Sequence, residues 1–208
     1  YSPYFNVNHE DEPSQMDLSS LEGLVSNPNI GIDQKIKKLI PFLNELAISK
    51  NANLFNSLKS ISQNLILAYP YEVKSWTLAA DVCFHGNQIS EAITNYKTAV
   101  EIGNVPFGVW DNLLFCLIHN NQWISLYKYA NLALDQFPNQ SYPYYALATS
   151  NLNLLQFDDA LSNVNQVLIM NKNNNNIRRE ALILQAQIYE ALGDLKNSNI
   201  KWTQAMEI

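Results

Sequence analysis

Charge is scarce in this sequence, and arginine is scarcer still. Charged residues occupy 15% of the 208 positions, and the only arginines are Arg178 and Arg179. A typical soluble protein carries about a quarter charged residues. The formal net charge is −6. Because a nucleic-acid-binding protein needs a basic surface to neutralise phosphates, this composition predicts no nucleic-acid partner.

Reactive and membrane-spanning signals are scarce too. The two cysteines, Cys83 and Cys116, show neither metal-binding spacing nor a disulfide framework, and each falls on the apolar face of a predicted helix. No apolar run reaches the roughly 18 residues that cross a bilayer, so we expect no direct membrane insertion. No phosphate-binding glycine loop or nucleophile motif occurs. The sequence therefore predicts no enzyme and indicates no cofactor.

What the sequence does contain is a period of 34 residues. Trp76, Trp110 and Tyr144 are spaced by this period, and small residues or valine recur with it at 99, 133 and 167. Similar residues surround each position. A fixed period of this length predicts a stack of antiparallel helix pairs, because one pair alone cannot bury its apolar faces and a stack can.

The period divides the chain into successive segments. We expect an N-terminal arm over 1–32 with a short helix at about 16–25, which is either a cap or the remnant of an upstream repeat. A degenerate helical repeat over 33–70 follows, and then four clear units over about 73–106, 107–140, 141–174 and 179–208. Asp33 is a candidate N-cap, and Pro41 predicts a kink or a fresh helix start. The asparagine-rich run at 171–176 shifts the register by four residues, which predicts a longer loop.

The residue types within each unit also follow a pattern: an aromatic residue, a small pair, a turn, then small, aromatic and small residues. In the unit at about 73–106 these are Trp76, Ala79-Ala80, Asn87, Ala92, Tyr96 and Ala99. The chain thereby resembles the tetratricopeptide repeat (TPR) family. The resemblance implies an all-α, right-handed superhelix of antiparallel helix pairs. The competing interpretation is a non-repetitive helical bundle.

In this family the first helix of each pair lines a concave groove that holds a partner. Carried over position by position, the resemblance places aromatic, amide and acidic side chains on that surface. Aromatic residues there favour protein or peptide recognition, unless they pack against their own neighbouring helices. The expected groove residues are Thr77, Asp81, Phe84, His85, Asp111, Asn112, Phe115, His119, Tyr142, Tyr145 and Thr149.

Two narrower possibilities concern this surface. The lysine–arginine–asparagine clamp with which some family members bind chaperone tails is replaced here by residues such as Asp81 and Asp111, which would repel a carboxylate. We therefore expect no chaperone-tail binding. His85 and His119 share a repeat position, each with an aspartate one or two turns earlier, so a metal or acid–base cluster is an alternative to solvated groove residues.

The sequence thus predicts a non-catalytic scaffold that binds a protein or peptide of unknown identity. A structural spacer or self-association module is the alternative, and an enzyme accessory domain is a third interpretation. Because the chain opens at Tyr1 and stops at the end of a repeat's second helix, without the polar capping helix that normally closes a solenoid, we expect a fragment of a longer protein. The composition resembles that of envelope-associated repeat proteins of AT-rich bacteria, which suggests a bacterial, periplasmic or cell-envelope setting.

Overall fold

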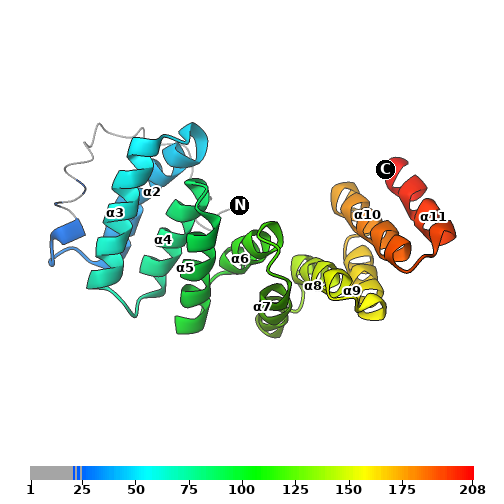
Figure 1. Ribbon diagram of the computed structural model, residues 1–208. Helices are drawn as coiled ribbons and strands as arrows, with labels where there is room; N and C mark the ends of the chain where they lie inside the picture. Colours follow the sequence, from blue (N-terminus) through cyan, green and yellow to red (C-terminus); the bar gives the residue numbers. More distant parts are fainter. Residues whose placement is uncertain (1–20, 22, 24) are drawn as a thin grey trace. The chain divides into compact units, whose positions relative to one another are not determined.

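The protein folds as consecutive antiparallel helix pairs. The computed structural model describes residues 21, 23 and 25–208, and every regular element in that part is an α-helix (Figure 1). This confirms the all-α class. The helices are α2 (Ile32–Ser49), α3 (Ala52–Ala68), α4 (Val73–His85), α5 (Ile89–Ile102), α6 (Phe107–His119), α7 (Trp123–Gln136), α8 (Ser141–Asn153), α9 (Phe157–Met170), α10 (Asn175–Ala191) and α11 (Leu195–Met206).

Packing divides these helices into two compact units. The first ends at Cys116 and the second runs over Leu117–Ile208, so the boundary falls inside α6. In the first unit α3 packs against α4, and the first helices α2 and α4 meet. In the second unit α7 packs against α8, α9 packs against α10, and α8 meets α10. Within each unit, neighbouring helix pairs therefore bury their apolar faces against each other, as the period predicts.

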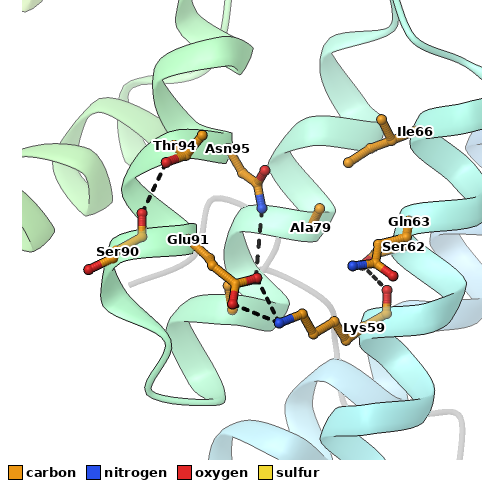
Figure 2. Close-up of a pocket in the computed structure, with 10 residues that line it drawn as sticks. Lys59, Ser62, Gln63, Ile66, Ala79, Ser90, Glu91, Thr94 and Asn95 are labelled. Atoms are coloured by element: carbon orange, nitrogen blue, oxygen red, sulfur yellow. Dashed lines mark hydrogen bonds and ion pairs between the residues drawn. The ribbon is translucent and has the colours of Figure 1, made fainter.

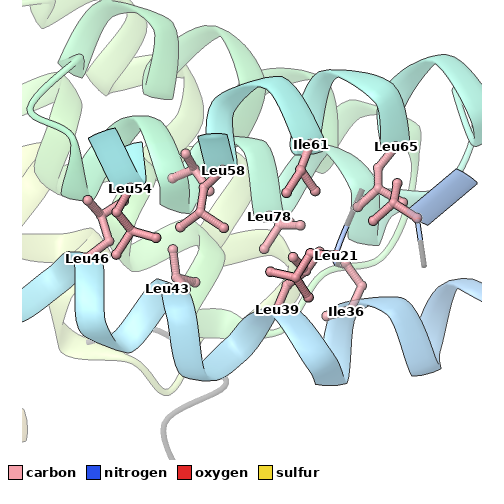
Figure 3. Packing of buried hydrophobic residues seen from close by; sticks show 12 residues of the cluster. Leu21, Ile36, Leu39, Leu43, Leu46, Leu54, Leu58, Ile61, Leu65 and Leu78 are labelled. Carbon is pink, nitrogen blue, oxygen red and sulfur yellow. The ribbon is translucent and has the colours of Figure 1, made fainter. Parts of the chain in front are cut away.

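The core of the first unit joins α2, α3 and α4. Leu39, Leu43, Leu58 and Leu65 are buried there, and Leu78 reaches the same cluster from α4 (Figure 3). Four of these positions lie at helical spacing on α2 or α3, so one apolar stripe from each helix closes the layer. The segment predicted as a degenerate repeat thus forms a packed helix pair.

A buried lysine of α2 forms hydrogen bonds that connect the segment before α2 with the α2–α3 pair. Lys35 is buried, and its Nζ donates to the Val25 carbonyl at 2.6 Å and to the Tyr69 hydroxyl at 3.1 Å. Of the short helix predicted around 16–25, residues 16–20, 22 and 24 lie outside the described residues; Leu21 and Val25 are helical and buried.

Two predictions about α2 need correction. The helix begins at Ile32 with Gly31 as its N-cap, so Asp33 lies in the first turn and forms an ion pair with Lys74 instead of capping. An acidic side chain in the first turn still favours the helix through its dipole. Pro41 lies within the continuous helix α2, so the predicted fresh helix start is wrong, and the alternative of a kink stays a prediction.

The 34-residue period is also seen in the backbone of the turns that join the two helices of a pair. Asn87, Asn121 and Leu155, 34 residues apart, have φ of 59°, 53° and 61°, and Gly193 has φ of 79°. After each of them the next backbone N–H returns to a carbonyl five residues earlier, at 2.8 to 3.0 Å. This is a C-terminal helix cap that needs one left-handed residue. The same turn therefore recurs in four successive pairs.

Leu155 is the residue least suited to that turn, and replacing it tests the geometry. A leucine in the left-handed region carries a steric cost that asparagine and glycine largely avoid. We expect Leu155→Asn to raise the free energy of unfolding by about 1 kcal/mol, since the side chain is exposed and makes little packing contribution. Urea unfolding followed by circular dichroism measures the change. Gly193→Ala, at the equivalent position, should lower stability by a similar amount, and equal stability in both variants would contradict this account.

The asparagine-rich run has a different consequence from the predicted longer loop. The α9–α10 loop spans 171–174, the same length as the α7–α8 loop at 137–140. The four extra residues lie in α10, which has 17 residues where α4, α6 and α8 have 13. Asn174 caps this helix, accepting from the Ile177 N–H at 3.2 Å. Four residues are close to one helical turn, so the insertion lengthens the helix while nearly preserving its buried face.

Candidate partner-binding surfaces

The first unit carries an aromatic cluster at the end of its first helices. Phe84 lies edge-to-face with Phe115, with ring centroids 5.8 Å apart, and contacts the His85 ring at 5.2 Å. Phe115 is 39% exposed, while Phe84 and His85 are half-buried. Such edge-to-face pairs hold ring orientations fixed. α4 and α6 therefore present a rigid aromatic surface that is partly open to solvent.

The backbone behind this cluster comes unusually close to another helix. A Cβ added at Gly86 would overlap the ring of Phe55, which belongs to α3. Gly86 has φ of −79°, so glycine is required here by the close approach and not by backbone conformation. Lys50 Nζ also donates to the His85 carbonyl at 3.2 Å. The C-terminal end of α4 is thus held by Phe55 of α3 and by Lys50, which follows α2.

Burial also sets the ionisation of the groups beside the rings. Desolvation lowers the pKa of His85 to about 4, with the nearby Lys50 charge acting in the same direction, so the imidazole is neutral at physiological pH. Burial raises the pKa of the Asp111 carboxyl above its ordinary value. Asp111 lies one turn before Phe115 on α6, so a half-buried carboxyl and an exposed ring share one face.

Three predicted groove residues lie in the interior instead. Thr77, Asp81 and Asn112 are buried, with 0%, 1% and 4% exposure. Tyr96 of α5 donates its hydroxyl to Asp81 Oδ1 at 2.5 Å and accepts from Asn112 Nδ2 at 3.2 Å, while Thr77 donates to the Val73 carbonyl. These polar side chains satisfy one another between α4, α5 and α6. They hold α4, α5 and α6 together and offer a partner almost no accessible surface, which corrects their assignment as groove residues.

In the second unit the corresponding surface is formed by tyrosines of α8. Tyr142 and Tyr145 stack with ring centroids 6.1 Å apart and an interplanar angle of 10°. Burial raises the pKa of Tyr145, as does the negative charge of Glu180 on α10. Thr149 is half-buried, and its hydroxyl donates to the Tyr145 carbonyl at 2.9 Å. His119 is exposed at the end of α6.

Metal sites and membrane-spanning helices are the other classes of feature to consider. Among the described residues no group of three or more histidine, cysteine, aspartate or glutamate side chains is placed to hold a metal ion. In the same part of the chain no helix has both the length and the apolar character needed to cross a bilayer. The cysteines are buried and unbonded to each other, as their positions on apolar faces predict. Burial raises the pKa of Cys83 to about 11, so its thiol stays protonated.

A concave site that the sequence reading missed lies between the second helices α3 and α5. Lys59 on α3 and Glu91 on α5 form an ion pair at 2.7 Å across it (Figure 2). Ala79 and Cys83 of α4 also line the cavity. The cavity has a volume of about 370 Å³. It could have been found by comparing residue sizes between periods, since it occurs where the residues are small. Its remaining lining residues are Ser62, Gln63, Ile66, Ser90, Thr94 and Asn95.

Comparison with known proteins adds a fold assignment. No protein-family model matches the sequence, and no curated protein matches it. Among solved structures, the chain is similar to YrrB, described as a TPR protein with an unusual peptide-binding site, with a TM-score of 0.64, 15% identity, and coverage of 85% of this chain and 89% of that one. It is also similar to MamA, with a TM-score of 0.66, 12% identity, and coverage of 81% and 90%. A MamA from Desulfovibrio magneticus RS-1 gives a TM-score of 0.63 at 10% identity, with coverage of 80% and 92%. The chain therefore has a TPR-like fold.

Proposed function

We propose that this chain is a non-catalytic scaffold that holds a protein or peptide against the first helices of its pairs. The observation that carries the proposal is the Phe84–Phe115 pair, where a ring 39% exposed to solvent is kept in one orientation by a neighbouring ring. A preformed aromatic surface loses little conformational entropy when it binds, which is why such residues dominate binding energy at interfaces. Tyr142 and Tyr145 provide a second surface of this kind. YrrB, of similar fold, has a peptide-binding site.

Charge supports a more specific partner chemistry. In each unit a carboxyl group accompanies the aromatic surface: Asp111 on the face of Phe115, and Glu180 close enough to Tyr145 to raise the pKa of its hydroxyl. The net charge of −6 adds a general attraction for cations. The ligand is accordingly an apolar peptide segment flanked by lysine or arginine, whose side chains can pair with a carboxylate and lie over a ring.

Selection of peptides tests this proposal directly. We expect a random phage-displayed library, panned on the protein, to yield sequences in which lysine or arginine flanks an aromatic or aliphatic residue. Phe115→Ala should weaken the selected peptides by about tenfold or more, since it removes a central aromatic contact. Isothermal titration calorimetry measures the affinity, and raising the salt concentration should lower it.

A matched control distinguishes this surface from general stickiness. Leu67 is an exposed apolar residue on the second helix α3, so Leu67→Ala removes at least as much exposed apolar surface from a helix that the proposal does not use. The affinity of the Leu67→Ala variant for the same peptides should stay within about a factor of two of the wild-type affinity, because most positions outside a binding hot spot are energetically near neutral. If Phe115→Ala and Tyr145→Ala both left affinity unchanged, the proposal would fail and the spacer or self-association alternative would be favoured.

A further inference from the structure

The cavity between α3 and α5 exists because this layer of the chain is built from small residues. Ser62, Ala79, Cys83 and Asn95 line it. One period of 34 later, the same positions hold larger side chains: Tyr96, Leu113, Leu117 and Tyr129. All four replacements add volume, and protein interiors normally fill such space. At these four positions the residue types of this layer therefore leave more space than those one period later.

The mouth of the cavity carries two opposite charges within reach of one small ligand. Lys59 Nζ lies 2.8 Å from Glu91 Oε1 and 2.7 Å from Glu91 Oε2, so the carboxylate and the ammonium face each other across the opening (Figure 2). Both side chains are partly exposed, with 26% and 48% of their surface open to solvent. An exposed ion pair of this kind contributes little to stability and is readily exchanged for other partners.

The interior below the charges is mainly uncharged. Ile66, Ala79 and Cys83 provide an apolar floor and wall, and Asn95 Nδ2 lies 3.7 Å from Cys83 Sγ. The cavity thus has one positive and one negative group at its mouth and apolar surface beneath. Its summed charge is zero, which disfavours phosphates and other multiply charged anions.

We propose that this cavity binds a free α-amino acid with an apolar side chain. The ligand's ammonium pairs with Glu91, its carboxylate pairs with Lys59, and its side chain enters the space over Ala79 and Cys83. An amino acid carries both charges on one small group, so two interactions replace the single pair that closes the empty cavity. The volume lies within the range of small-molecule pockets. This inference is independent of the peptide surface on the first helices.

Calorimetric titration of the whole protein with L-leucine tests the proposal. We expect binding at about millimolar affinity or tighter, and at least tenfold weaker binding of N-acetyl-leucine and leucinamide, each of which lacks one of the two charges. Glu91→Gln and Lys59→Met should each weaken leucine by a similar factor. Glu45→Gln, an exposed acid on α2 outside the cavity, is the matched control and should bind as the wild type does.

A filling variant separates the cavity from the surface charges. Asn95→Tyr introduces the residue found one period later, and it should abolish leucine binding while the helical circular dichroism signal and melting temperature remain close to wild type. If that variant fails to fold, Glu91→Gln and Lys59→Met still decide the question. The proposal is overturned if leucine shows no binding at concentrations of about 10 mM, if both blocked derivatives bind equally well, or if folded Asn95→Tyr retains binding.

Discussion

Replacing Tyr96 by phenylalanine should cost about 3 kcal/mol of unfolding free energy, because the hydroxyl it removes serves a buried carboxylate. Tyr96 is 0% exposed, Asp81 is 1% exposed, and their oxygen atoms are 2.5 Å apart. The same hydroxyl accepts from Asn112, so its loss removes two hydrogen bonds that connect α4, α5 and α6. Urea unfolding monitored by circular dichroism measures the loss.

Two controls show whether the carboxylate is the cause. Tyr71→Phe alters an exposed hydroxyl and should change stability by less than about 0.5 kcal/mol. Adding Asp81→Asn to Tyr96→Phe should recover part of the lost stability, because an amide is less costly to leave under-bonded than a carboxylate. A double variant as unstable as the sum of both single variants would contradict this explanation.

The Tyr96 hydroxyl should also make the free energy of unfolding depend on pH in the alkaline range. Burial, together with the negative charge and hydrogen bond of Asp81, raises the pKa of Tyr96 well above its ordinary value of 10. Below pH 10 the hydroxyl is protonated in both the folded and the unfolded chain. Above pH 10 the unfolded chain releases this proton and the folded chain keeps it, so the free energy of unfolding falls as pH rises. Tyr96→Phe lacks the proton, and its stability should therefore fall less steeply over that range.

The buried position of this network explains why the candidate binding surface was only partly predictable. Helical spacing predicts Phe84 and Phe115 on the groove side of the first helices; in the structure Phe115 is 39% exposed and Phe84 is half-buried, and their role in a groove stays a prediction. Helical spacing misplaced Asp81 and Asn112, because a polar residue is ordinarily assigned to the solvent side of a helix. Their true location depends on a hydroxyl 15 and 16 residues away on α5. Hydrogen bonds between buried side chains of different helices depend on the tertiary structure, and the residue pattern of a single helix does not reveal them.

The turns at Asn87 and Asn121 show the opposite case, because asparagine is one of the few residues that adopt the left-handed region readily and local sequence was enough there. The left-handed conformation of Leu155 is indicated only by its place in the 34-residue period and not by its residue type. The sequence also shows the four-residue shift of the repeat near 171–176, but it does not tell whether the extra residues lie in the loop or in the helix. Asparagine favours loops and helix N-caps about equally well, and the structure uses Asn174 as a cap and places the extra turn in α10. The cavity between α3 and α5 needed a comparison of side-chain size across periods.

Removing the indole of Trp110 should have the largest effect on the free energy of unfolding. Trp110→Ala and Trp110→Phe should differ widely in this effect. Trp110 is 1% exposed, so Trp110→Ala opens a large cavity in the layer of α6 and should cost about 4 kcal/mol. Its Nε1 atom is buried without a hydrogen-bond partner among the described residues. Trp76, one period earlier, instead donates its Nε1 to the Pro70 carbonyl at 2.8 Å.

Trp110→Phe separates the volume of the indole from its unpaired N–H. The phenyl ring fills most of the space and removes a donor whose burial costs about 1–3 kcal/mol, so we expect a net change within about 1 kcal/mol. Trp76→Phe gives up a hydrogen bond that is already made and serves as the comparison. Hydrogen exchange of the α5 and α6 amides, together with urea unfolding, measures both effects in the relevant helices. Losses of similar size for Trp110→Phe and Trp110→Ala would mean that the Nε1 group is bonded in solution, and the unpaired-donor argument would then be wrong.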